Sequence, residues 1–358
     1  MSLGRAIGVL AIALAVATPA FAQTSIEAYG GVGIARVPGS GSVTLPPAGP
    51  PIVTSNPIFP SRQTASWFLG DGAAMLNDAA TDLGILNRLA PLDMALATLP
   101  FETRPAAAFG VRVRRTFKTR YELEVSVDVL PSRARATNAL SAAAETSRVS
   151  FQDTFSALFA SGPFVSTTVD AATNAVRGSG RSVALTGALV VPLGAHRSLS
   201  PYLTVGGGVL SASGAAASVT LAGHYRTTVH AGVPTLDVPI EEFDRLTVKY
   251  QERTTPVGLG GAGVTRSFGG SWALRIDARA LVGLNTARIL IDATPSSTTG
   301  SPAGFIELFT FPAIEFSNNP STGRQSTLSG DGLRGVTIFE GTGIAVHAIV
   351  SVGIVKRF

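Results

Sequence analysis

Residues 121–129 read Tyr-Glu-Leu-Glu-Val-Ser-Val-Asp-Val, a strict alternation of apolar and polar side chains. Successive side chains of a β-strand point to opposite faces, so this stretch has one apolar and one polar face. Residues 109–114 alternate in the same way, and residues 118–120 supply a short turn between the two stretches. We predict a hairpin that places Arg114 opposite Glu124, because opposite charges stabilise a cross-strand pair, and Thr116 opposite Glu122.

The same period recurs along the chain. Strong alternation is found at 272–285 and 344–356, and weaker, glycine-diluted alternation at 25–36, 181–194, 199–212 and 255–267. Short turns near 118, 196 and 270 alternate with long links at about 38–105, 132–180, 213–254 and 293–341. Short turns at one rim and long loops at the other are typical of outer-membrane barrels. The predicted fold is all-β: an eight-stranded antiparallel up-and-down transmembrane β-barrel with long, partly helical extracellular loops.

The composition excludes several other classes of protein. Of 358 residues, 14% are charged and none is cysteine, and the mean hydropathy is +0.32. So few charges disfavour a coiled coil or a charge-driven disordered chain. The lack of cysteine excludes a disulfide scaffold and a thiol catalyst. The net charge of +5 comes from mostly dispersed cations, so we expect no nucleic-acid partner.

The first 22 residues have the pattern of a secretory signal. Arg5 precedes an apolar stretch at 6–17, and Ala20-Phe21-Ala22 forms a small-residue cleavage box. We therefore expect a signal peptide at 1–22 and a mature barrel at 23–358. No later stretch reaches 18 consecutive apolar residues. The predicted location is the bacterial outer membrane.

Charged residues on the polar strand faces are predicted to line the barrel lumen. Eight strands leave an interior that side chains can fill. The nearly balanced signs predict an internal salt-bridge network in place of a charged conduction path, since unpaired buried charges are costly. The predicted members are Glu27, Arg112, Arg114, Glu122, Glu124, Asp128, Arg275, Asp277 and Arg279.

Aromatic residues beside the short turns and at the C-terminus indicate an interfacial girdle, as outer-membrane barrels carry. These residues are Phe117, Tyr121, Tyr202, Phe268, Trp272 and Phe358.

The C-terminal residues 351–358, Ser-Val-Gly-Ile-Val-Lys-Arg-Phe, resemble the assembly signal of bacterial outer-membrane barrels. Ser351, Gly353 and Phe358 match that pattern, whereas Lys356 replaces its usual hydrophobic penultimate residue. With its topology, the mature chain resembles the eight-stranded outer membrane protein A-like and opacity-type barrel superfamily. The resemblance implies insertion by the barrel-assembly machinery of a Gram-negative cell and contact with outer-membrane lipid and lipopolysaccharide.

The long links are expected to carry the function, because loops on a rigid scaffold usually do. Helical spacing is found at 76–86, with Asp71 as an N-cap, and at 140–159. Alternation at 219–225 and 246–250 predicts that the third link extends a hairpin beyond the membrane. Apolar loop residues have two interpretations, a lid over the barrel mouth or a pocket for a small hydrophobic ligand or lipid. They are Phe151, Phe155, Phe159, Phe305, Phe309, Phe311 and Phe316.

Motifs for chemistry are weak. The G-x-G-x-x-G at 258–263 continues as a predicted strand, whereas a dinucleotide site needs a following helix. His224 and His230 are poorly spaced for one metal, and His347 lies four residues from Ser351. We expect no enzyme activity, no cofactor and no metal. The predicted role is structural, surface-interacting or binding, carried by the extracellular loops; the alternative is a conduit or binding protein for small hydrophobic solutes or lipids.

Overall fold

The computed structural model describes residues 23–36, 41–44, 51–52, 61–62, 66–97, 100–117, 121–131, 134–159, 165–177, 180–194, 199–213, 217–229, 238–299 and 333–358. The predicted signal peptide at 1–22 lies outside these residues. The fold is dominated by antiparallel β-structure, as the sequence predicts.

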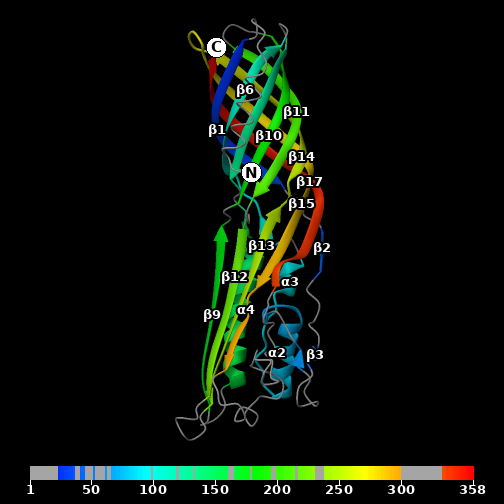
Figure 1. The fold of residues 1–358 in the computed structure, drawn as a ribbon, viewed down its shortest axis with the longest axis vertical. Helices are drawn as coiled ribbons and strands as arrows, with labels where there is room; N and C mark the ends of the chain where they lie inside the picture. The colour runs from blue at the N-terminus through cyan, green and yellow to red at the C-terminus, as the bar shows by residue number, and fades with distance from the viewer. Residues whose placement is uncertain are drawn as a thin grey trace.

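Long strands pair in a ring that occupies one end of the molecule (Figure 1). Antiparallel pairing runs in the order β17, β1, β6, β7, β10, β11, β14, β15, and β15 pairs in turn with β17. We call these strands the strand ring. They are β1 (Thr24–Arg36), β6 (Ala106–Phe117), β7 (Tyr121–Pro131), β10 (Arg181–Pro192), β11 (Leu199–Ser213), β14 (Thr255–Ser267), β15 (Trp272–Ala293) and β17 (Leu333–Arg357).

Each predicted strand overlaps a strand of the ring, although the one predicted at 181–194 ends at Pro192, and the predicted hairpin register is confirmed. Arg114 pairs with Glu124, and Thr116 pairs with Glu122. The segments flanking the short links form the adjacent pairs β6–β7, β10–β11 and β14–β15. The turn after β14 is described in full, and its Gly269 and Gly270 adopt φ values of 122° and 50°. Glycine populates this left-handed region without the penalty of a Cβ.

Two strands of the ring run far beyond it. β15 has 22 residues and β17 has 25, so β17 spans about 80 Å at about 3.3 Å per residue. The predicted segments at 272–285 and 344–356 cover only their ring portions. Beyond the ring, Ala287–Ala293 of β15 pair with β13 and with β17. The two strands therefore continue into a second, elongated part of the molecule, which we call the extension (Figure 1).

The extension is an open sheet covered by helices on one face (Figure 1). β12 (Ala217–Val229) pairs with β13 (Val238–Glu252), which confirms that the third link extends a hairpin. Its outer strand, β9 (Val165–Arg177), was not predicted, because small and polar residues dilute its alternation. The helices are α2 (Gly70–Asp82), α3 (Asp93–Leu96) and α4 (Asn138–Phe159). Shorter strands complete the fold: β2 (Ser42–Val43), β3 (Pro51–Ile52), β4 (Ser61–Arg62), β5 (Phe101–Glu102), β8 (Arg135–Ala136) and β16 (Ser296–Thr299).

The predicted helix at 140–159 is confirmed as α4, but the helix at 76–86 ends early. α2 stops at Asp82, and Gly84 turns the chain at φ 68°. Leu86 is consequently 93% exposed instead of lying on a packed helical face. The carboxylate of Asp93, in place of the predicted Asp71, accepts hydrogen bonds at 3.1–3.2 Å from the Gly70 amide at the start of this helix.

A hydrophobic core of its own holds the extension together. Phe151 and Phe155 of α4 are fully buried there, against Phe68, Trp67 and Tyr225. They therefore pack between helix and sheet within the extension, and the prediction that they form a lid over the barrel mouth or line a ligand pocket is wrong for these two residues. The side chain of Phe159 and all of Phe305, Phe309, Phe311 and Phe316 lie outside the described residues.

The interior of the strand ring contains an apolar layer that alternation did not predict. The inward faces carry isolated apolar residues among polar ones, and the apolar residues contact one another across the ring. The members of this layer are Ala108, Leu130, Ala184, Ala188, Leu210, Val257, Leu259, Leu281 and Ile349.

Contact between α4 and the sheet requires a glycine. A Cβ on Gly223 of β12 would lie 2.5 Å from Cζ of Phe151. We predict that Gly223→Ala lowers the free energy of unfolding of the extension by about 1–3 kcal/mol, because the fully buried ring must shift. The measurement is denaturant unfolding followed by Trp67 fluorescence in a Trp272→Phe background. The control is Gly187→Ala in β10, where nothing lies within 4 Å of the added Cβ; equal stability of the two variants would contradict this packing.

Candidate functional site

The predicted lumen charges converge inside the strand ring. Three buried carboxylates each contact several arginines. Glu124 accepts from Arg114 Nε at 2.6 Å, Arg275 Nη1 at 3.1 Å and Arg279 Nη2 at 3.0 Å. Glu27 accepts from Arg112 at 3.1 Å and from Arg275 at 2.6 Å. Every one of these side chains is nine-tenths or more buried.

Asp277 is the third centre of the network. Its Oδ2 lies 2.8 Å from Arg112 Nη1 and 3.0 Å from both Arg279 Nε and Arg275 Nη2. Its Oδ1 accepts a hydrogen bond from Ser351 Oγ at 2.7 Å. The carboxylate is thus surrounded by donors from β6, β15 and β17, which satisfies the rule that buried charges need both opposite charge and hydrogen bonds.

The network crosses the ring from side to side. β7 carries Glu124, and β15 carries Arg275 and Arg279. The two strands are four pairings apart along the strand order in either direction, so they face each other. The ion pairs between them span the interior. They join opposite walls of the ring through side chains that fill the interior.

Two tyrosines complete the network, and the sequence did not identify them as members. Tyr202 was expected in the interfacial girdle, but its side chain points inward and is 4% exposed, so that prediction is wrong. Its ring lies 4.4 Å from the guanidinium carbon of Arg275, and its hydroxyl donates to Asp277 at 3.1 Å. Tyr29 stacks 3.7 Å below the guanidinium carbon of Arg112 and donates to Asp128.

Glycines directly opposite the two tyrosines make room for their rings. Tyr29 pairs with Gly110 and Tyr202 with Gly263. A Cβ on Gly263 would lie 2.2 Å from the Tyr202 hydroxyl oxygen. Because each glycine is far from its tyrosine in the sequence, only the strand pairing shows that the two are partners.

All nine predicted lumen residues lie on inward faces or at the mouth of the ring, with different degrees of involvement. Asp128 accepts from Tyr29 and from Ser126. Glu122 contacts only the edge of the network, at 3.2 Å from Arg114 Nη1, and its side chain is 31% exposed. The remaining seven residues form the connected centre.

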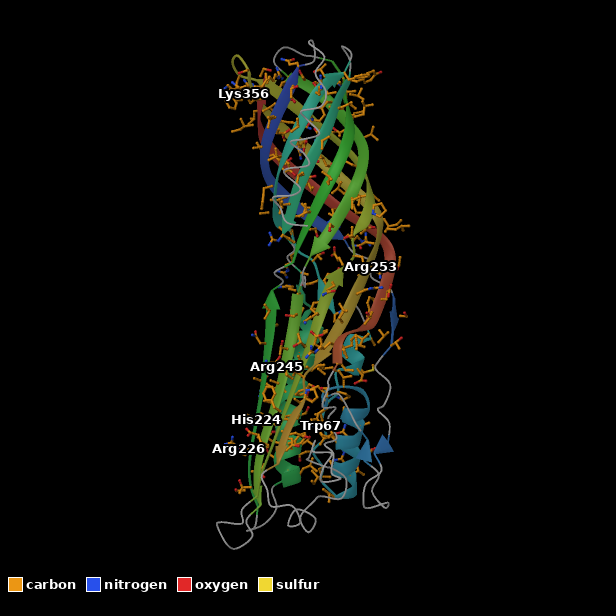
Figure 2. The ribbon with its side chains drawn as sticks, viewed as in Figure 1. Trp67, His224, Arg226, Arg245, Arg253 and Lys356 are labelled. Carbon is orange, nitrogen blue, oxygen red and sulfur yellow. The ribbon has the colours of Figure 1, made fainter. Side chains whose placement is uncertain are left out.

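The C-terminal residues join the ring's short-turn end. The Phe358 amide donates to the Thr24 carbonyl at 2.9 Å, while its side chain is 70% exposed. Gly353 lies against the Glu27 carboxylate, which a Cβ would approach to 2.3 Å. Lys356, the departure from the assembly pattern, places its ammonium 4.6 Å from the Trp272 ring centroid and donates to Ser271 at 2.6 Å (Figure 2). The Lys356 ammonium thus has two partners, Trp272 and Ser271, at the position where the assembly pattern has a hydrophobic residue.

The weaker motifs have structural roles in the described chain. Residues 258–263 lie within β14, which is followed by another strand. Ser351 hydrogen-bonds Asp277 and Arg112, and His224 contacts Glu241 at 2.6 Å on the outer face of the extension. Across the described residues, no group of three or more histidines and carboxylates is arranged to hold a metal ion. His196 and His230 lie outside the described residues.

A further buried carboxylate anchors the extension. Asp244 of β13 is 1% exposed and accepts hydrogen bonds from the Trp67 amide at 2.7 Å and from Ser66 Oγ at 3.0 Å. Burial raises the pKa of this carboxyl from 3.8 to about 7. The residue holds the chain that leads into α2 against the sheet.

Comparison with known proteins gives distant structural matches. No family model and no curated protein sequence matches the chain. Among solved structures, the outer membrane protein OprG from Pseudomonas aeruginosa is similar with a TM-score of 0.38 and 8% identity, over 93% of this chain and 95% of that one. The translocator domain of the autotransporter NalP from Neisseria meningitidis is similar with a TM-score of 0.17 and 10% identity, over 99% and 95% of the two chains. Both TM-scores are below 0.5.

Removing one carboxylate from the network should destabilise the strand ring. We predict that Glu124→Gln lowers its free energy of unfolding by about 3–5 kcal/mol, because the buried guanidinium groups of Arg114 and Arg279 lose their anion. The control, Glu122→Gln, removes a half-buried partner and should cost about 1 kcal/mol or less. Urea unfolding of the refolded protein measures both changes, and comparable losses would refute a central role for Glu124.

The buried Asp244 should make the extension sensitive to pH. Its pKa is about 7 when folded and near 3.8 when exposed, so the folded chain keeps a proton that the unfolded chain has released. The contribution of Asp244 to the free energy of unfolding is therefore fully present below about pH 4 and is lost as the pH rises to about 7, by roughly 4 kcal/mol.

Asp244→Asn should remove that fall, because the amide oxygen still accepts the Trp67 hydrogen bond without an ionisation. Unfolding monitored by Trp67 fluorescence between pH 4 and 8 measures the difference. Asp292→Asn is the control, since this carboxylate on the outer face of the sheet pairs with Lys249 and the ion pair lowers its pKa. An unchanged pH profile in Asp244→Asn would show that another group is responsible.

Proposed function

We propose that the strand ring is a closed eight-stranded β-barrel integral to the bacterial outer membrane, and that it anchors the extension outside the cell for surface contact or binding. The observation that carries this proposal is the distribution of exposed apolar side chains. A closed barrel leaves no unpaired strand edge, which is what the hydrocarbon interior of a bilayer requires. Among the described helices, none is long and apolar enough to span a membrane.

Large exposed apolar residues concentrate on the outward faces of the ring. Such a belt is costly in water and favourable in lipid. The extension, in contrast, exposes few large apolar residues among those described. The belt consists of Ile26, Val32, Ile34, Phe109, Val111, Leu123, Val125, Leu185, Leu203, Val205, Val209, Val264, Leu274, Ile276, Val282, Leu284, Ile344, Val350, Val352 and Ile354.

Aromatic side chains mark one border of this belt. Phe117, Tyr121, Phe268, Trp272 and Phe358 are 41–70% exposed and lie at the short-turn end. Aromatic rings of outer-membrane barrels occupy the interface between lipid and water. This end also holds the start of β1 and the end of β17, so it corresponds to the periplasmic side, and the extension corresponds to the cell exterior.

The filled interior supports an anchoring role over an open passage. The cross-ring ion pairs and the apolar layer occupy the described interior one after the other. A solute would have to displace both to pass. The extension therefore carries the proposed structural, surface-contact or binding role, without enzyme activity. The ring contacts outer-membrane lipid and lipopolysaccharide, and the barrel-assembly machinery inserts it.

The outer face of the extension sheet is the surface best suited to contact. It presents alternating charges from β12 and β13, including His224, Arg226 and Arg245 (Figure 2). Glu241 accepts from both His224 and Arg226, and Arg245 lies 5.1 Å from the Phe243 ring. Polar, partly exposed side chains of this kind bind other surfaces through hydrogen bonds and complementary charge.

A charge placed in the belt distinguishes a membrane barrel from a water-soluble one. We predict that Ile276→Arg, at a site that is 52% exposed, lowers stability in lipid by about 2–4 kcal/mol and reduces the amount assembled in outer membranes. The matched control is Leu86→Arg in the extension, where the side chain is 93% exposed and the charge should have little effect. Heat-modifiable gel mobility of outer-membrane fractions measures assembly; equal assembly of the two variants would overturn the membrane proposal.

A further inference from the structure

The charged residues on the outward face of the strand ring are all cations. The acidic residues of the ring point inward, where Glu27, Glu124 and Asp277 contact arginines. Within the ring, the outward faces of the described strands carry no aspartate or glutamate. Their charged residues are Arg36, Arg115, Arg181, Arg266 and Lys356. A face with charges of one sign attracts groups of the opposite sign, so its neighbours are expected to be anionic.

These cations lie at the two borders of the apolar belt and not inside it. Arg36 ends β1 and Arg181 begins β10, at the side of the extension. Arg115, Arg266 and Lys356 lie within two residues of the short-turn ends of β6, β14 and β17, beside the aromatic girdle. Lipid headgroups occupy the borders of the hydrocarbon layer, so cations placed there can meet the phosphates.

Two cations of the short-turn border flank an exposed tryptophan. Lys356 of β17 pairs with Trp272 of β15, which is 44% exposed. On the other side of β15, Arg266 of β14 pairs with Leu274. Neighbouring strands are about 4.8 Å apart, so the Cα atoms of Lys356 and Arg266 are separated by roughly 12 Å. Two long side chains can close this distance around one phosphate group.

Both cations keep hydrogen-bond donors for an anion. The Lys356 Nζ lies 4.6 Å from the Trp272 ring centroid and donates to Ser271 Oγ at 2.6 Å (Figure 2). An ammonium has three donors, so this hydroxyl leaves others available. Arg266 is exposed, and its side chain forms no ion pair or hydrogen bond with any described residue. A guanidinium fork of this kind matches a phosphate in a bidentate way.

We propose that Lys356 and Arg266 form a binding site for the phosphate of an anionic phospholipid in the periplasmic leaflet. The phosphate lies between the ammonium and the guanidinium, and an acyl chain follows the exposed side chains of Leu274 and Ile276. Lipid binding also accounts for a lysine at the position where the assembly pattern has a hydrophobic residue. This inference rests on the proposed membrane location and adds a lipid partner of defined charge.

The test is quenching of Trp272 fluorescence by brominated lipids. The full mature chain is reconstituted into vesicles of phosphatidylglycerol and phosphatidylcholine in equal parts, in which only one of the two lipids carries bromine on its acyl chains. We expect stronger quenching when phosphatidylglycerol is the brominated lipid, because both lipids have a phosphate but only phosphatidylglycerol has a net negative charge. Trp67 is buried in the extension, and its constant emission is measured with Trp272→Phe.

Lys356→Gln and Arg266→Gln should each lower the preference for phosphatidylglycerol about three- to fivefold, because each removes a cation from the membrane surface. Lys356→Arg should retain the preference. The matched control is Arg36→Gln, which removes a cation from the same outward face at the opposite border and should leave the preference unchanged. The ratio of the two quenching values cancels any direct effect of a substitution on the emission of Trp272.

Different outcomes separate this inference from the membrane proposal. Equal quenching by the two brominated lipids would overturn the anionic lipid site and leave the membrane barrel intact. An equal loss of preference in Arg36→Gln would overturn a local site in favour of general surface charge. Loss of the preference in millimolar inorganic phosphate, at constant ionic strength, would assign the site to a free anion and overturn the lipid. Quenching by neither lipid would overturn the membrane barrel and this inference with it.

Discussion

The rest of the structure depends on one interaction, the network of ion pairs between four arginines and three carboxylates inside the strand ring. Glu124 on β7 and the arginines of β15 face each other across the interior, so their ion pairs hold opposite walls at a fixed separation. Charges removed from water are tolerated only when each is paired and hydrogen-bonded. The network therefore requires the complete ring of strands, and the ring in turn encloses it.

The interior is layered along the axis of the ring. The charged network lies toward the short-turn end, the apolar layer follows, and a pocket lined by Glu252 and His347 lies at the junction with the extension. The first two layers differ in chemistry, because ion pairs hold one together and dispersion contacts the other. The paired charges and the apolar layer together fill the described interior of the ring.

Strand continuity joins the two parts of the molecule. β15 and β17 remain paired from the ring into the extension, apart from register shifts near Leu290 and Ala293. The extension adds β13, β12 and β9 to that continued ladder and covers them with α4. Because its core includes fully buried Phe151, Phe155 and Tyr225, the extension is a packed unit and not a set of independent loops.

Alternation along the sequence was enough to determine the strands of the ring, the register of the hairpin that pairs Arg114 with Glu124, and the inward charges. These features depend on the period of two, which is local. Tertiary structure alone decided that Tyr202 points inward opposite Gly263, that Leu130 and Ile349 meet in an apolar layer, and that Phe151 packs against Gly223. Each of these depends on contact between residues far apart in the chain, where the space left by a glycine or the closing of a ring matters more than any local pattern. For the same reason Glu252 and His347, unremarkable in their own segments, line one pocket only once the strands that carry them are assembled.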